Sequence, residues 1–299
     1  MHKIRLVAVI LVVIAAIALA AHFSTTDLEY SRYNWEWTGT SGFFSLLEEQ
    51  GARDITAYAA LSGSNDTLLL IIAPDAPYTP DEVSALRSFL DGGNTVFIAD
   101  ETGESNELLA GLGSTISVIY GNLSSADREY ADPRSVMVYP KGEDPITANV
   151  SALVLNRPAV VSGGDILLTT SLFSWVDANG NGRIDGGEDL SSFAVLAREA
   201  VGNGTLYVFS DPSIVANGML NARLTADNRL FIDQLLTIRE HVLVDQSHSL
   251  TAGADAVLSL ANRVKNTMVI KISLLILSIT TLAFACSRRW GDDHGPKNH

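Results

Sequence analysis

The stretch DTLLLIIAPDAPYTPDEVSALRSFLDGGNTVFIAD, residues 66–100, decides the fold class. It begins with the apolar run TLLLII and ends with TVFIA, and neither run alternates with polar residues. Such runs are typical of strands that are buried on both faces of a parallel sheet. Between them, Thr79 and Pro80 start a helix with regularly spaced apolar residues, and Gly92 and Gly93 end it. The stretch therefore predicts a β-α-β unit of an α/β fold.

The same alternation of strands and helices continues on both sides of this unit. Residues 114–164 contain short strand-like pieces separated by turns, which predict a β-rich insertion. The other expected elements are a short helix at 41–50, a short helix at 105–113, two strands joined by a glycine turn at 193–211, a helix at 225–238 and a strand with its loop at 241–249.

Two long apolar runs, at residues 6–21 and 268–286, lie near the two ends of the chain. Their length predicts an N-terminal transmembrane anchor at 1–22 and a C-terminal transmembrane helix at 267–287. The first run has the alternative interpretation of a cleaved signal peptide. The basic residues outside both runs predict that both termini are cytoplasmic, with a tail at 288–299.

This topology makes residues 23–249 an extracytoplasmic domain, joined to the second span by an amphipathic helix at 250–266. The chain carries a net charge of −14, which disfavours nucleic acid as a partner. Its one cysteine, Cys286, lies in the second apolar run. The predicted domain therefore has no disulfide, no thiolate metal site and no cysteine nucleophile.

The loop DANGNGRIDGGE, residues 177–188, has the spacing of a twelve-residue calcium loop. Gly182 permits the sharp turn, and Ile184 is expected to reach the core. The predicted ligands of a structural calcium ion are Asp177, Asn179, Asn181, Arg183 through its carbonyl group, Asp185 and Glu188. A strand-like segment precedes the loop and the chain has no paired second loop, so sensing is not expected. The alternative is a solvent-exposed turn without an ion.

A serine hydrolase site is a second interpretation of the polar residues. Ser213 follows a predicted buried strand, and His248 with Asp245 could complete a triad. The competing interpretation is that Asp211 and Pro212 open a turn before a helix. Trp35 and Trp37 could bind a ligand or anchor their segment. Four glycosylation sequons are present, at Asn65, Asn122, Asn149 and Asn203.

The order of these pieces resembles a family of prokaryotic, often archaeal, membrane proteins known as domain of unknown function 4350. The resemblance is carried by YSRYNWEWTGTSGFFSLLEEQG, TPDEVSALRSFLDGGNTVFIAD, SWVDANGNGRIDGGED, GTLYVFSDPSIVANGML, DNRLFIDQLL and VLVDQSH. It implies a flavodoxin-like domain similar to class I glutamine amidotransferases. It also implies that the protein acts together with a MoxR-type ATPase system or is an auxiliary subunit of an ABC transporter.

The resemblance also limits the expected activity. Class I glutamine amidotransferases use a cysteine after a buried strand, whereas the equivalent strand here is followed by Asp100, Glu101 and Thr102. Glutaminase chemistry is thereby excluded. We expect a non-catalytic bitopic envelope protein whose outer domain binds a protein partner or a small ligand. The alternatives are the transporter subunit and the hydrolase near Ser213 and His248.

Overall fold

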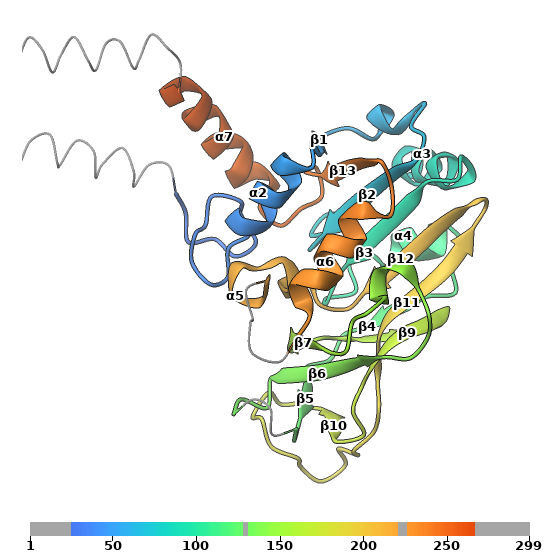
Figure 1. Cartoon of the computed structure of the whole chain (residues 1–299), viewed down its shortest axis with the longest axis vertical. Coiled ribbons are helices and arrows are strands. Elements are labelled where there is room, and N and C mark those ends of the chain that lie inside the picture. Colours follow the sequence, from blue (N-terminus) through green and yellow to red (C-terminus); the bar gives the residue numbers. More distant parts are fainter. Residues whose placement is uncertain (1–24, 128–130, 221–225, 267–299) are drawn as a thin grey trace, which may run out of the picture. The chain divides into compact units, whose positions relative to one another are not determined.

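The computed structural model describes residues 25–127, 131–220 and 226–266 (Figure 1). The chain forms two compact units, residues 27–252 and residues 1–26 with 253–299. The described part of the smaller unit is dominated by helix α7 (Ala252–Asn266), so the helix expected at 250–266 is present. The larger unit carries the sheet.

The predicted transmembrane architecture is not supported by the described residues. Among residues 25–127, 131–220 and 226–266, no helix is long and apolar enough to cross a membrane. The expected spans at 1–22 and 267–287 and the tail at 288–299 lie outside these ranges. The expectation of a bitopic cell-membrane protein with both termini cytoplasmic is corrected on this finding.

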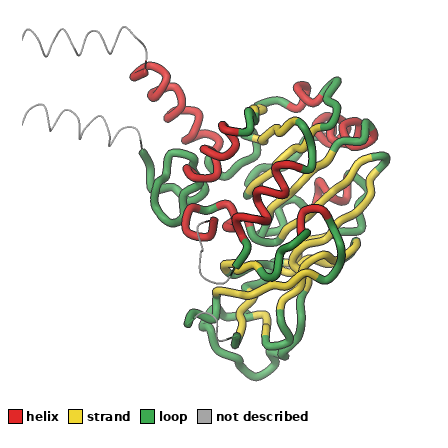
Figure 2. Tube along the Cα trace, in the orientation of Figure 1, coloured by secondary structure: helices red, strands yellow, loops and turns green. Residues whose placement is uncertain are grey.

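A nine-stranded mixed sheet forms the centre of the larger unit (Figure 2). Its first half is parallel, because neighbouring strands pair in the same direction from β1 to β12. In spatial order, this half consists of β1 (Arg53–Ile55), β13 (His241–Asp245), β2 (Thr67–Ile72), β3 (Thr95–Ala99) and β12 (Gly204–Phe209). The β-α-β unit predicted from residues 66–100 is therefore confirmed at β2 and β3.

The other half of the sheet is antiparallel. It consists of β11 (Ala194–Val201), β9 (Asp165–Thr170), β6 (Ser135–Pro140) and β7 (Leu153–Asn156). Two small ladders complete the strands, β4 (Ser117–Ile119) with β8 (Val160–Ser162) and β5 (Leu123–Ser125) with β10 (Ser174–Val176). The residues expected to form an insertion thus contribute β6 and β7 to the main sheet.

This topology corrects the flavodoxin-like expectation. A flavodoxin-like sheet has five parallel strands in the order 2-1-3-4-5. Here the last parallel strand, β13, lies between the first two, β1 and β2, and four antiparallel strands extend the sheet beyond β12. The fold is a mixed α/β sheet. The expectation of a glutamine amidotransferase-like domain depended on the flavodoxin-like one and is corrected as well.

Helices cover both faces of the parallel half (Figure 1). Side chains of β2 alternate between the faces, with Leu68 and Leu70 in one core and Leu69 and Ile71 in the other. The first core contains α2 (Ser41–Glu49), η2 (Pro145–Thr147), η3 (Pro212–Val215), α5 (Asn217–Leu220) and α6 (Asn228–Thr237). The second contains η1 (Tyr58–Leu61), α3 (Pro80–Asp91) and α4 (Asn106–Gly111).

Helix α3 begins as its sequence predicts. Thr79 accepts a hydrogen bond from the backbone of Glu82, and the Glu82 carboxylate accepts one from the backbone of Thr79 at 2.8 Å. This reciprocal capping satisfies two backbone donors that the helix itself cannot satisfy. It also fixes the Glu82 side chain at the carboxyl edge of the sheet, beside the loop that follows β13.

Candidate functional site

The topology places a switch point at the carboxyl ends of β3 and β12. The two strands are parallel neighbours. After β3 the chain runs to α4 in one core, whereas after β12 it runs to η3, α5 and α6 in the other. In open α/β sheets, ligands bind where neighbouring strands send their connections to opposite faces. We therefore take the carboxyl ends of β3 and β12 as the candidate site.

Asp100 is the first residue after β3, and it is a structural part of this site. Its backbone donates to Phe209 at 2.9 Å. Its buried carboxylate accepts bonds from the backbones of Thr102 and Ser105 at 2.8 Å and from the Ser105 hydroxyl at 2.6 Å. These bonds hold the turn that leads into α4 and leave little capacity for a ligand.

Asp211 lies at the same switch point, two residues after β12. Its fully buried carboxylate accepts bonds from the Ser213 backbone at 2.8 Å, the Ser213 hydroxyl at 2.5 Å and the Asn156 backbone at 2.7 Å. Burial disfavours the charged form and raises its pKa to about 6, although these hydrogen bonds act in the opposite direction. Asp211 therefore opens the turn into η3, as the competing interpretation of this motif predicted.

Glu101 is the third acidic residue at this switch point, and its carboxyl group can still take part in hydrogen bonding. It is half-buried, and the Tyr30 hydroxyl donates to its Oε1 at 3.3 Å. Burial raises its pKa to about 8, and the negative charge of Asp211 adds to this shift. Glu101 consequently keeps its proton at neutral pH. A neutral carboxyl group can both donate and accept a hydrogen bond.

Tyr30, which contacts Glu101, belongs to residues 27–40, which we call the strap. The strap is folded on itself, because Tyr30 donates its backbone N–H to Thr38 at 3.0 Å and Thr40 donates its hydroxyl to the Tyr30 carbonyl at 2.8 Å. Tyr30 has a positive φ of 59°. That conformation is costly for a non-glycine residue and persists only where the surroundings impose it.

Asn217, at the start of α5, fastens the strap to the domain. Its side-chain amide donates to the Glu36 carbonyl at 2.8 Å, and its side-chain oxygen accepts from Gly42 at 2.8 Å. Next to it, the Trp37 indole covers Gly218 so closely that a Cβ there would lie 2.0 Å from Trp37 Nε1. Trp35 is 77% exposed. The strap thus contacts Glu101 through Tyr30 and exposes Trp35 to solvent.

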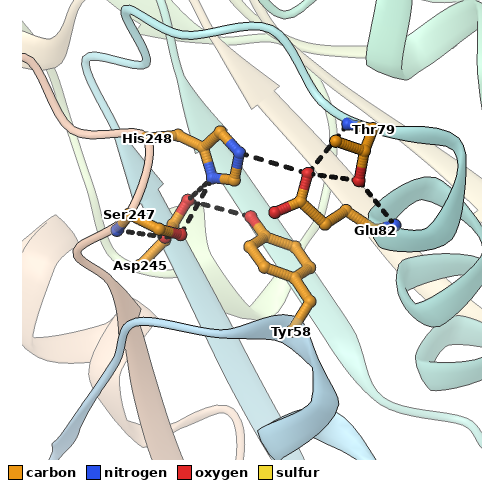
Figure 3. A network of polar contacts seen from close by, with 6 residues as sticks. All are labelled: Tyr58, Thr79, Glu82, Asp245, Ser247 and His248. Atoms are coloured by element: carbon orange, nitrogen blue, oxygen red, sulfur yellow. Dashed lines mark hydrogen bonds and ion pairs between the residues drawn. The ribbon is translucent and has the colours of Figure 1, made fainter.

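Asp245 and His248, which the triad hypothesis paired, do meet at the same edge of the sheet (Figure 3). His248 Nδ1 lies 2.9 Å from Asp245 Oδ2, and His248 Nε2 lies 3.5 Å from Glu82 Oε2. The Tyr58 hydroxyl donates to Asp245 at 2.8 Å, and Tyr78 stacks on the imidazole with ring centroids 4.0 Å apart. The histidine is buried among these groups.

Ser213 does not join this pair. In a catalytic triad the serine hydroxyl faces the imidazole nitrogen that the aspartate leaves free. Here that nitrogen, Nε2, faces Glu82, and the Ser213 hydroxyl donates to Asp211. The geometry instead makes His248 a link between the loop after β13 and the start of α3.

We expect His248→Gln to remove a pH-dependent part of the stability. Burial alone lowers the His248 pKa, but the bond and charge of Asp245, aided by Glu82, outweigh burial and raise it. A raised histidine pKa contributes stability that is fully present below about pH 6.5 and is lost as pH rises through the folded-state pKa. Urea unfolding from pH 6 to 9 should therefore show a difference in the free energy of unfolding between wild type and variant that becomes smaller as pH rises.

The matched control is His241→Gln, because His241 is exposed at the start of β13. His241 lies outside the link between Asp245 and Glu82, so the effect of this variant on the free energy of unfolding should not follow that of His248→Gln. A difference in the free energy of unfolding between wild type and His248→Gln that stays constant with pH would contradict the charged link of His248 with Asp245 and Glu82.

The loop 177–188 is closed by its own hydrogen bonds. The buried Asp177 carboxylate accepts from the backbones of Asn181 at 3.1 Å and Gly182 at 2.7 Å. The Glu188 carboxylate accepts from the backbones of Ala178 and Asp185, both at 2.9 Å. The loop therefore has the expected turn.

The calcium-binding interpretation of this loop is corrected. The side-chain amides of Asn179 and Asn181 both donate to Asp185 at 2.7 Å. The Arg183 backbone donates to the Asn181 side chain, and Ile184 is 47% exposed, so it does not reach the core. Across the described ranges, no group of three or more His, Cys, Asp or Glu side chains could hold a metal ion.

The sequons lie outside the regular elements. Asn65, Asn149 and Asn203 are exposed in loops, and Asn122 is half-buried directly before β5. The Asn203 side-chain amide donates to the Asp91 carbonyl at 2.9 Å. Glycosylation at these four positions stays a prediction.

Solved structures with similar folds are distant in sequence. The chain is similar to the mmIFT52 N-terminal domain, with 17% identity, a TM-score of 0.49, and coverage of 66% of this chain and 90% of that one. It is also similar to a cytoplasmic protein, STM1381, from Salmonella typhimurium LT2, with 12% identity, a TM-score of 0.38, and coverage of 67% and 87%.

A further similarity is to a β-galactosidase from the Antarctic haloarchaeon Halorubrum lacusprofundi, with 14% identity, a TM-score of 0.35, and coverage of 60% of this chain and 23% of the enzyme. No curated protein matches the chain. The family described as domain of unknown function DUF4350 matches residues 32–236, more than half of the chain, and the protein therefore belongs to that family.

Proposed function

We propose that the larger unit is a non-catalytic binding module and that its strap is the surface to which a protein partner binds. The observation that carries this proposal is the exposure of two tryptophans, Trp35 at 77% and Trp37 at 50%, on a segment that is fastened over the sheet's carboxyl edge. Tryptophan side chains dominate binding energy in protein interfaces. Their exposure on a well-fastened segment favours recognition of a protein surface.

Two further observations support binding over catalysis. After β3 and β12, the carboxylates of Asp100 and Asp211 accept hydrogen bonds from backbone groups of their own turns. Ser213 and His248 lie in different clusters, because the Ser213 hydroxyl donates to Asp211 and His248 faces Glu82. The residues weighed for a hydrolase are therefore engaged in structural contacts, which favours the binding interpretation over the hydrolase.

Site-specific photo-cross-linking in the native cells tests this proposal. A photoreactive phenylalanine analogue in place of Trp35 is expected to give one discrete adduct with another polypeptide. The matched control carries the analogue in place of Leu172, which is 71% exposed in the turn between β9 and β10. This control should give no such adduct.

The same experiment separates binding from catalysis. The adduct should persist when Ser213→Ala and His248→Gln are combined with the probe at position 35, because neither side chain belongs to the strap. Identical patterns from positions 35 and 172, or no adduct from position 35, would sink the proposal.

A further inference from the structure

A cavity of about 470 Å³ lies near the first residues of β3 and β12, at the opposite edge of the sheet from the switch point. Its walls include Pro145 of η2 and Ile238, which follows α6. A volume of this size is within the range of small-molecule sites, which is about 300–1,000 Å³. The residues that line it therefore define which kind of molecule it can hold.

The floor of the cavity consists of two rows of side chains on one face of the sheet. In the first row, Thr95 of β3 pairs with Thr205 of β12. In the second row, Tyr207 of β12 pairs with Arg198 of β11, which pairs with Asp165 of β9 on its other side. Paired residues share a face of the sheet, as do residues two apart on one strand. All five side chains therefore point to the same side.

Arg198 enters the cavity from β11 and has hydrogen-bonding capacity left. Its Nη1 donates at 2.7 Å to Asp144, whose side chain is fully buried, and its Nη2 donates to Asp165 at 3.4 Å. A guanidinium group has five N–H donors, so three of them have no acceptor among the described residues. The Asp165 side chain is 76% exposed, and its carboxylate can accept further bonds.

Arg239 enters the same cavity from the loop that follows α6. Its Nε donates to the Thr95 hydroxyl at 2.9 Å, and its Nη1 donates to Asp66 at 3.2 Å. Three of its N–H donors likewise have no acceptor in the part of the chain that the structure describes. Thr95 and Arg198 lie on strands that flank β12, and these strands are about 10 Å apart. The cavity thus offers guanidinium donors at two separate points.

We propose that this cavity binds a small acidic α-amino acid, with its α-carboxylate on Arg198, its ammonium group on Asp165 and its side-chain carboxylate on Arg239. The charged residues of the lining carry two positive charges and one negative, and such a ligand carries the complementary set. Guanidinium groups recognise carboxylates through paired N–H bonds. Arg198 and Asp165 are direct neighbours across the sheet, which suits two groups that are bonded to one carbon.

Isothermal titration calorimetry on the full-length protein at pH 7 tests this proposal with three probes. L-Glutamate is expected to bind with a Kd below about 1 mM. Glutarate lacks the ammonium group and L-glutamine lacks the second carboxylate. Each should therefore bind at least about tenfold more weakly, because one charged partner in the cavity is left without its counterpart.

Two variants assign each charge of the probe to its residue. Arg239→Gln should weaken L-glutamate at least about tenfold and leave the binding of L-glutamine unchanged. Asp165→Asn should weaken L-glutamate but not glutarate. The second variant changes an exposed carboxylate, so it keeps the test independent of any loss of stability in the first. Arg198 is left in place, because its removal would leave the buried charge of Asp144 without its partner.

Arg229→Gln is the matched control. Arg229 lies on α6, is exposed, forms an ion pair with Asp233 and does not line the cavity. It should bind L-glutamate as wild type does. The proposal is overturned if L-glutamate does not bind at about 10 mM, if glutarate binds equally well, or if Arg239→Gln and Arg229→Gln have equal effects. None of these results involves the strap, so this proposal and the proposed partner binding fail separately.

Discussion

Replacing Glu101 by Gln is expected to raise the free energy of unfolding at pH 9 by about 2–3 kcal/mol. In the folded protein, burial and then the charge of Asp211 raise the Glu101 pKa from 4.5 to about 8. A carboxyl group with a raised pKa lowers the stability progressively as pH rises from about 4.5, and this loss is complete above about 8. A shift of this size corresponds to about 1.4 kcal/mol per pH unit, and the expected effect is smaller because solvent reaches a half-buried side chain.

Chemical unfolding in urea at pH 5, 7 and 9 checks this expectation. The increase in the free energy of unfolding of Glu101→Gln over wild type should be smallest at pH 5 and largest at pH 9. His248→Gln has a different profile, because its gap from wild type starts to change only above about pH 6.5. A gain for Glu101→Gln that is equal at all three values would contradict the raised pKa.

Removing the Asp211 carboxylate is expected to lower the free energy of unfolding by about 3 kcal/mol at pH 7. Asp211→Ala leaves the backbone N–H groups of Asn156 and Ser213 and the Ser213 hydroxyl without their acceptor, and the two donors of Ser213 are buried. Each unsatisfied buried donor costs about 1–3 kcal/mol. Part of this cost is offset, because the variant no longer buries a carboxylate whose pKa is raised to about 6.

Two neighbouring variants make the test specific. Ser213→Ala removes one donor and keeps the acceptor, so its expected loss is about 1 kcal/mol. Asp211→Asn keeps one acceptor oxygen, and its loss should lie between those of the other two variants. Calorimetry or urea unfolding of the three proteins gives the order. A loss for Asp211→Ala no larger than that for Ser213→Ala would show that the carboxylate does not hold this turn.

Much of the secondary structure was predictable because local patterns specify it. The apolar runs of β2 and β3 are buried on both faces, and the Thr79 cap and Pro80 start α3 as expected. The paired strands β11 and β12 and helix α6 follow in the predicted order. These features depend on residues that are neighbours in sequence, so a single sequence contains the information.

The predictions that were wrong depended on contacts between distant residues. The position of β13 between β1 and β2 is decided by burial of the whole sheet, and no local pattern in residues 241–245 shows it. The calcium-loop spacing correctly marked a turn, and in that turn the Asn179 and Asn181 amides donate to Asp185. Spacing along a chain does not determine where amide groups point.

By itself, the sequence of this protein determined an α/β chain with buried parallel strands, capped helices and an acidic surface, because periodicity, turn residues and charge are local properties. The strands also placed Asp100 and Glu101 at a carboxyl edge. Only the tertiary structure decided that Tyr30, 71 residues away, covers Glu101 and that Asp211 lies close enough to raise its pKa. The energy of a charge depends on burial and on distances through space, and both exist only once the chain is folded.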